Sequence, residues 1–363
     1  MKVSGDIKSC GRSTLVGLAL VGFGITANAQ SSVTLYGVVD AGLLYTTKSL
    51  NTATGGNAGH QYSMLDSGSG ASRFGIKGSE DLGGGMKAIF TLESGISMAK
   101  GGSGNSNGNL FGRQAWVGLT SGFGTVQVGL QYSPFALSLI NTDARDASYF
   151  GSGAGIYIGN VLTTGLFNPN GVSYTSPVIA GFQASAMLAL GGQPGDVQAG
   201  RQYSARLKYH YGGLVVDAAM YNGNAGGTAA TTPIPSAVAF TGRTIGAIYE
   251  FGSWTLKASF ANFKVAGAFD TRVYDGGLSY FVTPSVKVDA GVWYVSDGNN
   301  TANHTILAAT GAQYFLSKRT ALYGQVAYVN NHGAMHTGLS INNALHEASG
   351  STTGVNVGIR HSF

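Results

Sequence analysis

Side chains that could carry out covalent or metal chemistry are present in this chain, but their spacing does not favour such chemistry. The histidines His304, His332, His336 and His346 fall in expected loops, and they lack both the spacing of metal ligands and neighbouring acids. Serine and aspartate are common, yet no G-x-S-x-G motif or triad-like arrangement occurs. The glycine-containing runs at 67–70 and 83–85 precede no expected helix that would hold a phosphate. The sequence therefore predicts no enzyme, no metal site and no cofactor.

The charged residues have a regular arrangement instead. In the segment 202–211, Arg206 and Lys208 alternate with apolar residues. Successive side chains of a β-strand point to opposite faces, so this pattern predicts a strand with one charged face and one apolar face. The same alternation recurs along most of the chain, for example at 286–295. A charged face of this kind orders water and attracts or repels ions, and it makes or breaks no bonds.

The charges expected on these polar faces include both signs. Eight are basic: Arg73, Lys77, Arg113, Arg206, Lys208, Lys257, Lys287 and Arg360. Six are acidic: Asp40, Glu93, Asp217, Glu250, Asp275 and Asp289. Two further acids, Asp143 and Asp146, lie in a long connection and make the totals equal. Any channel lined by these residues is expected to select only weakly between ions of opposite sign.

The composition suits either a large β-sandwich or a β-barrel that shows apolar faces to lipid. The chain has 363 residues, of which 58 are glycine, about twice the usual share, and only 10% are charged, against about a quarter in typical proteins. After residue 25, no apolar run is long enough for a membrane-spanning helix. The net charge is +5, of which residues 1–29 contribute +2 and the remainder +3, too little to indicate a nucleic-acid partner.

The first 29 residues have the pattern of a secretory signal peptide. Lys2, Lys8 and Arg12 precede an apolar run at 15–25, and Ala-Asn-Ala at 27–29 provides a cleavage site. We expect residues 1–29 to be removed after export. The single cysteine, Cys10, lies in this segment, so the exported protein is expected to have no disulfides.

The alternating segments number sixteen and are joined in turn by very short turns and by longer polar loops. The longer connections lie near 47–71, 98–110, 133–170, 191–200, 222–241, 264–270, 296–304 and 330–351. This pattern, an even number of strands with short turns at one end and long loops at the other, predicts an all-β fold. We expect residues 30–363 to form a single domain, a 16-stranded antiparallel transmembrane β-barrel. Aromatic residues near segment ends are expected to form girdles at the membrane surfaces: Tyr203, Tyr211, Trp254, Tyr280, Tyr294, Tyr328 and Phe363.

The longest connection, 133–170, interrupts this pattern. It has no clean period of two, and its only charges are Asp143, Arg145 and Asp146. A long irregular connection in a compact protein is usually functional. We expect this third long loop to fold into the lumen of the barrel and to form a constriction set more by size than by charge.

Several motifs resemble those of a known family. SSVTLYGVVDAGL at 31–43, SRFGIKGSEDLGGGMKAIFTLESG at 72–95, FGRQAWVGL at 111–119 and VGIRHSF at 357–363 are similar, in the same order, to motifs of the general trimeric porins of Gram-negative bacteria, of the β-proteobacterial type. The resemblance covers residues 30–363. It implies an outer-membrane homotrimer that contacts lipid and lipopolysaccharide, and a third loop inside the lumen. It also implies that Phe363 is a signal for the barrel assembly machinery.

The resemblance also implies a set of constriction residues. The basic wall of such porins corresponds here to Arg73 and Arg113, with Lys77 nearby, and the opposing acidic loop residues correspond to Asp143 and Asp146. Further lumen-lining residues are expected at Asp40, Glu93, Arg206, Lys208, Lys257 and Arg360. The family often has an arginine where this chain has Leu130, and basic residues are common where it has 170–173 (NGVS). Both departures make the expected wall less basic than is usual in the family.

The favoured interpretation is a general diffusion channel for ions and small hydrophilic solutes. Two alternatives belong to other classes. One is a channel dedicated to a single substrate, and the other is a surface binding or adhesive protein for which the barrel is only an anchor. A ladder of aromatic side chains along the lumen would favour the first alternative. Contact-rich long loops would favour the second, but loop 98–110 consists mainly of glycine, asparagine and serine.

Overall fold

A computed structural model describes residues 31–161, 165–227 and 238–363. The expected signal peptide lies outside this range. Within it, seventeen antiparallel strands form one sheet, and two further strands form a separate hairpin. The strands are β1 (Ser32–Thr46), β2 (Gln61–Asp66), β3 (Arg73–Gly83), β4 (Met86–Gly95), β5 (Gln114–Ser121), β6 (Gly124–Tyr132), β7 (Phe167–Thr175), β8 (Phe182–Ala189), β9 (Gln202–Tyr211), β10 (Leu214–Gly223), β11 (Phe240–Phe251), β12 (Trp254–Val265), β13 (Phe269–Thr283), β14 (Val286–Asp297), β15 (His304–Phe315), β16 (Thr320–His332), β17 (Thr337–Ser340), β18 (Ala344–His346) and β19 (Gly350–Ser362).

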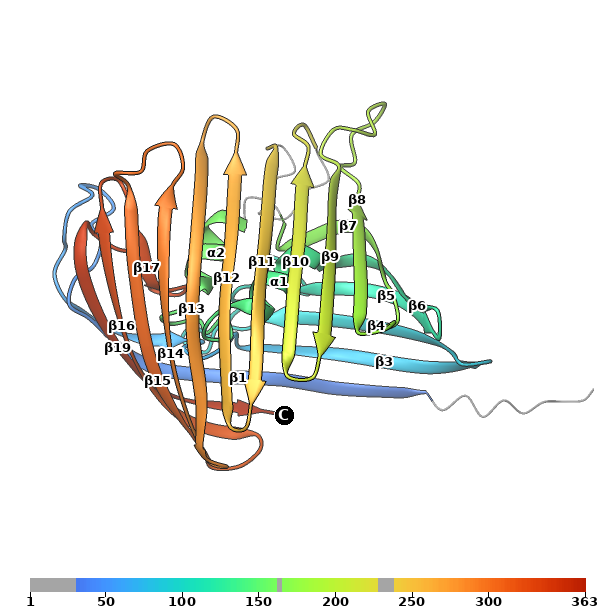
Figure 1. The fold of residues 1–363 in the computed structure, drawn as a ribbon, viewed down its shortest axis with the longest axis horizontal. Helices are drawn as coiled ribbons and strands as arrows, with labels where there is room; N and C mark the ends of the chain where they lie inside the picture. Colours follow the sequence, from blue (N-terminus) through green and yellow to red (C-terminus); the bar gives the residue numbers. More distant parts are fainter. Residues whose placement is uncertain (1–30, 162–164, 228–237) are drawn as a thin grey trace, which may run out of the picture.

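The large sheet closes into a ring. From β3 to β16 each strand pairs with the next one along the chain, β16 pairs with β19, and the first strand, β1, pairs with the last, β19, from Val38–Ser362 to Thr46–Gly354. Strands β2 and β3 both pair with β1, at successive parts of its length, and so occupy one position in the ring. The closed barrel therefore has sixteen strand positions, as expected. Figure 1 shows β9 to β16 side by side in front, with β1 and β3 crossing behind them.

A single loop was expected at 47–71, but this range contains strand β2. Strand β2 (61–66) pairs with the second half of β1, and residues 67–72 then leave the ladder before β3 begins. The backbone N–H groups of Gly68, Ser69 and Gly70 donate to the Asp40 carboxylate at 3.0, 3.0 and 2.9 Å. A contact between residues about thirty positions apart thus determines the break in the strand, and local sequence patterns contain no sign of it.

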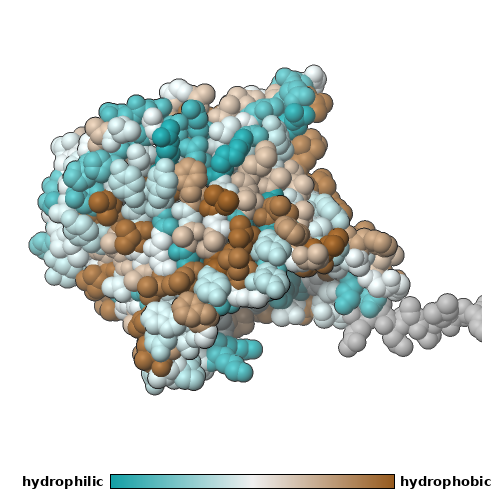
Figure 2. Space-filling model, viewed as in Figure 1, coloured by the Kyte–Doolittle hydropathy of each residue, from teal (hydrophilic) through white to brown (hydrophobic). Residues whose placement is uncertain are grey.

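The two faces of the barrel wall have the expected polarity. Along β11, exposed and buried residues alternate, with Ile245 52% and Tyr249 50% exposed. The expected aromatic residues on this outer face include the stacked pair Trp254 and Tyr280, whose ring centroids are 4.3 Å apart. Figure 2 shows a hydrophobic band across the middle of the visible face, with hydrophilic residues above it. None of the helices in the described residues is long and apolar enough to cross a membrane.

The connection between β6 and β7 is shorter and more regular than expected. It contains two helices, α1 (Pro134–Thr142) and α2 (Gly153–Val161), and β7 already begins at Phe167. Helix α1 starts at Ser133, whose hydroxyl accepts a hydrogen bond from the Ala136 N–H at 3.0 Å. We call residues 133–166 the third loop. The sequence pattern does not predict these helices. Helix α1 has apolar residues on more than one side and therefore shows no clear helical period.

The third loop lies against the inner wall of the barrel. Helix α1 contacts strands β8 to β12, and Figure 1 shows both helices enclosed by the strands. Phe135 of α1 is fully buried between the rings of Tyr221 and Phe263, with centroid distances of 6.3 and 5.9 Å. A Cβ atom at Gly242 would lie only 2.5 Å from the Phe135 ring, so a side chain at this wall position would push α1 away.

Candidate functional site

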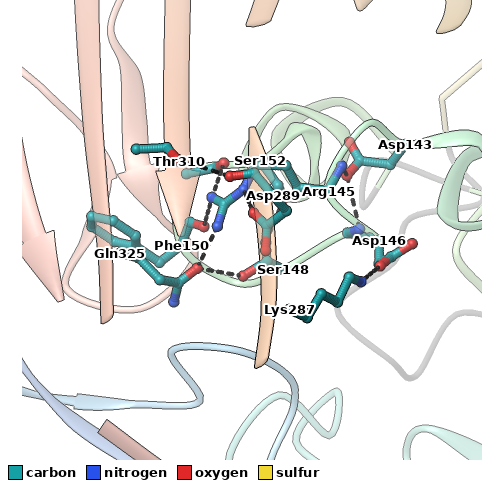
Figure 3. Close-up of polar contacts among 12 residues, drawn as sticks. Asp143, Arg145, Asp146, Ser148, Phe150, Ser152, Lys287, Asp289, Thr310 and Gln325 are labelled. Carbon is teal, nitrogen blue, oxygen red and sulfur yellow. Dashed lines mark hydrogen bonds and ion pairs between the residues drawn. The ribbon is translucent and has the colours of Figure 1, made fainter. Parts of the chain in front are cut away.

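Arg145 attaches the third loop to two strands further round the barrel than those that α1 packs against (Figure 3). Its Nε atom donates to the Asp289 carboxylate on β14, and Nη2 donates to Gln325 Oε1 on β16 at 2.9 Å. Nη1 donates to the backbone oxygen of Gly151 at 2.6 Å. Arg145 is only 5% exposed, and its planar guanidinium satisfies all three partners at once. Sequence patterns identify Arg145 only as a charge, because Asp289 and Gln325 are 144 and 180 residues away along the chain.

Asp143 does not face the lumen, contrary to the expectation for the acidic loop residues. Its carboxylate accepts from the backbone N–H groups of Arg145, Ala147 and Gly153 at 3.0, 2.8 and 3.0 Å, and from Trp293 Nε1 at 3.1 Å. The residue is fully buried, and burial raises its pKa despite these donors. Asp143 therefore holds the turn between the two helices together and adds no charge to an open surface.

Asp146 does face the lumen, but two lysines neutralise it. Its side chain is 56% exposed, and Lys257 Nζ and Lys287 Nζ lie 2.6 and 2.8 Å from its two oxygens. Partial enclosure by the wall acts to raise the pKa of Asp146, but attraction by the two lysines outweighs this and lowers it to about 2. Lys257 also donates to the backbone oxygen of Asn141 at 3.0 Å. Lys257, expected to line the lumen, thus belongs to the attachment of the loop.

The expected basic wall is divided into paired and open parts. Arg113 is 6% exposed, and its Nε and Nη2 atoms donate to Glu93 at 2.8 Å and to the Tyr132 hydroxyl at 2.7 Å. Arg73 is closer to the open space, with a side-chain exposure of 29%, and lies 3.5 Å from Glu93. The side chain of Arg360 makes no hydrogen bond or ion pair within the part of the chain that the structure describes, and its Nε atom is buried without a partner.

Three further residues that were expected to line the lumen lie outside the two cavities described below: Arg206, Lys77 and Lys208. Arg206 pairs with the fully buried Asp217, which also accepts from Ser138 of α1 at 2.8 Å, so this ion pair lies behind the helix. Lys77 lies over the Tyr36 ring, 5.3 Å from its centroid. Lys77 and Lys208 lie on inner-face positions of β3 and β9 outside the two cavities described next.

Two adjoining cavities lie between the third loop and the wall. The larger has a volume of about 740 Å³ and includes Arg73, Glu93, Arg113, Asp146 and Arg360 in its lining. The smaller, of about 260 Å³, shares Ser69, Asp146 and Arg360 with it and also includes Arg145, Lys287 and Asp289. Together these linings contain five cationic and three anionic side chains. Among the described residues, no group of three or more His, Cys, Asp or Glu side chains is placed to hold a metal ion.

These features define a class of protein: a closed sixteen-stranded barrel with an apolar outer band, a charged lumen and a loop packed inside it. Residues 17–334 match the family model described as Gram-negative porin, and the chain belongs to this family of outer-membrane channels. It is 32% identical to outer membrane porin protein 32 of Delftia acidovorans, over 97% of this chain and 100% of that protein. It is 29% identical to an outer membrane porin protein of Bordetella pertussis, with the same coverage of 97% and 100%.

A solved structure supports the same assignment. The anion-selective porin from Comamonas acidovorans superposes with a TM-score of 0.78 at 30% identity, covering 92% of this chain and 100% of that one. The expected fold, family and outer-membrane location are thereby confirmed.

The Arg145 attachment leads to a first prediction. Arg145→Gln leaves Asp289 buried without its cation, which typically costs about 3–5 kcal/mol. We expect the third loop to detach from β14 and β16 and single-channel recordings to become noisier, with a higher mean conductance. The double variant Arg145→Gln with Asp289→Asn removes both charges and should restore part of the thermal stability, measured by the temperature at which the folded band is lost on gels. A quiet channel of wild-type conductance in Arg145→Gln would contradict this role of Arg145.

The lowered pKa of Asp146 leads to a second prediction. Because its pKa of about 2 lies below the ordinary 3.8, the carboxylate stays charged from neutral pH down to about pH 4, and its lysine contacts are lost as the pH falls through about 2. Protonation frees two positive charges, so anion preference should rise over that acidic range. Asp146→Asn should have the higher preference already at neutral pH. Reversal potentials in a KCl gradient at stepped pH test this, and an identical pH profile in the two proteins would refute it.

Proposed function

We propose that this porin forms a water-filled diffusion channel, that the third loop constricts it, and that it prefers small anions. The observation that carries the proposal is the balance of charge around the two cavities, five cations against three anions. Each of the three acids, Glu93, Asp146 and Asp289, has at least one cationic partner within 4.0 Å. Arg360 has no such partner among the described residues and lines both cavities, so its charge remains available to ions in transit.

This proposal replaces the expectation of weak selectivity from equal numbers of charges. The equal tally treated Asp143 as a lumen residue, but its carboxylate is buried in the loop. It also counted Asp40, which is held by the backbone amides of 68–70 and by the Tyr323 hydroxyl. Acids that are buried and hydrogen-bonded in this way repel a passing anion less than exposed ones do. The similar porin from Comamonas acidovorans is described as anion-selective, which is consistent with the proposal.

Assembly as a homotrimer in contact with outer-membrane lipid and lipopolysaccharide forms part of the proposal and rests on family resemblance. The proposed assembly signal is Phe363. Its backbone N–H and C=O pair with those of Gly37 at 3.0 and 3.1 Å, and its ring lies over Gly37 on the outer face of the barrel. The residue is 43% exposed, which is compatible with recognition of the ring before the last strand closes the barrel.

Arg360 is the residue with which we test the charge preference. Arg360→Gln should lower the ratio of chloride to potassium permeability, and the same change at Arg73 should lower it by less, because Glu93 already offsets part of that charge. Arg319→Gln serves as a matched control, since it removes the same charge from the exposed turn between β15 and β16. Reversal potentials in a KCl gradient give the ratio. A cation-preferring wild-type channel, or equal effects of Arg360→Gln and Arg319→Gln, would overturn the proposal.

A flux measurement separates general diffusion from dedicated transport or a purely adhesive role. Liposomes carrying the protein should swell in sugars up to a sharp size limit, without preference between stereoisomers of one size. Saturation by a single sugar would favour a dedicated channel, and no swelling would favour a barrel that serves only as an anchor. We expect deletion of 141–155 to raise the size limit and the conductance together, because these residues occupy the lumen.

A further inference from the structure

One side of the larger cavity is apolar, which ion permeation alone does not explain. Leu137 and Ile140, three residues apart on α1, line this cavity and remain 41% and 39% exposed. The opposite side of α1 is buried against the barrel wall through Phe135, so these two side chains project away from the wall. Leaving two large aliphatic side chains in contact with water costs free energy that polar residues would avoid.

Further apolar groups extend this surface. Ile158 of α2 and Ile341, in the turn between β17 and β18, line the same cavity. We call Leu137, Ile140, Ile158 and Ile341 the apolar strip. Ile158 is partly buried against the core of the loop, whereas Leu137 and Ile140 present the largest open areas. The strip comes from separate segments of the chain that the fold brings to a single cavity.

The same cavity is lined by two guanidinium groups that are not fully paired. Arg360 has no acidic partner among the described residues, although its Nε atom itself is buried. Arg73 uses Nη1 to donate to the backbone oxygen of Ala71 at 3.0 Å, and its Nε faces Glu93 at 3.5 Å, so no hydrogen bond in the described structure uses its Nη2. A guanidinium with free N–H groups binds a carboxylate strongly because its planar donors match the two oxygens.

The combination of an apolar strip and free guanidinium groups identifies a solute class. We infer that the larger cavity binds monocarboxylates with a compact apolar body, aromatic or branched aliphatic, during their passage. The carboxylate pairs with Arg360 and Arg73, and the body contacts Leu137 and Ile140. A volume of about 740 Å³ accommodates a solute with a single ring. The inference rests on the proposed anion channel and adds the chemical class that the channel prefers.

The two halves of the site exclude different competitors. A hydrophilic anion such as gluconate satisfies the arginines but leaves the apolar strip in water. A cationic ring compound such as benzylammonium matches the strip but is repelled by Arg73 and Arg360. Benzoate satisfies both. Binding in a channel must remain weak enough for release, so the expected sign is a brief, concentration-dependent block of current and not a tight complex.

The test compares these three ions on the complete channel in planar bilayers, at neutral pH, where benzoate is charged. Benzoate should half-block the KCl current at a concentration about tenfold lower than gluconate, and benzylammonium should block least; tenfold is the order of discrimination that a small apolar contact provides. Equal block by benzoate and gluconate, or block by benzylammonium as strong as by benzoate, would overturn the inference.

Two variants test whether the apolar strip causes the stronger block by benzoate. Leu137→Asn with Ile140→Asn should raise the half-blocking concentration of benzoate about tenfold and leave that of gluconate and the KCl reversal potential unchanged. Val197→Asn is the matched control, since Val197 is 73% exposed in the loop between β8 and β9 and lines neither cavity. Unchanged benzoate block in the double variant would overturn the inference. Absence of anion preference in the wild-type channel in KCl would instead count against the proposed function, so the two failures can be told apart.

Discussion

The pairing of β1 with β19 is the constraint on which the rest of this structure depends. In a lipid membrane, an open sheet edge would leave backbone N–H and C=O groups without partners, and each would cost several kcal/mol. Nine residue pairs, from Val38–Ser362 to Thr46–Gly354, remove that edge by joining the two ends of the described sheet. Closure also separates the environments of the two faces. Alternate residues of each strand then face either the outside of the barrel or one enclosed space, and charged residues such as Arg73, Glu93 and Asp289 line cavities in that space.

That enclosed space is partly filled by the third loop, which must satisfy its own polar groups in a confined setting. The loop does so with few charges, each with a distinct task. Asp143 organises its backbone, Arg145 attaches it to β14 and β16, and Asp146 attaches it to the two lysines of β12 and β14. A buried charge is tolerated only when it is paired or hydrogen-bonded, and the buried Asp143 and Arg145 both meet that condition. The Phe135 ring packs over Gly242 of β11 and adds an apolar contact with another part of the wall.

The charge that a solute meets in the lumen depends on which charged side chains are already paired with one another. Glu93 is engaged by Arg113 and Arg73, Asp217 by Arg206, and Asp289 by Arg145. Each of these acids is paired, whereas Arg360 lines both cavities without an acidic partner among the described residues. A count of residues would assign equal weight to every charge. Burial and pairing instead decide how strongly each one acts on a solute in the lumen.

The architecture can be predicted from the sequence alone, because period-two alternation, the spacing of turns and the apolar outer face are properties of neighbouring residues. The sequence also located the third loop and the wall residues Arg73, Arg113 and Arg360, since their positions follow from strand periodicity and family motifs. Which charged side chains pair with one another, and which face the cavities, depends on the folded structure. The break between β2 and β3, the burial of Asp143, the attachment by Arg145 and the exposure of Leu137 and Ile140 depend on contacts between residues distant in the chain. Those contacts exist only once the ring has closed and the loop has packed inside it, and no local pattern encodes them.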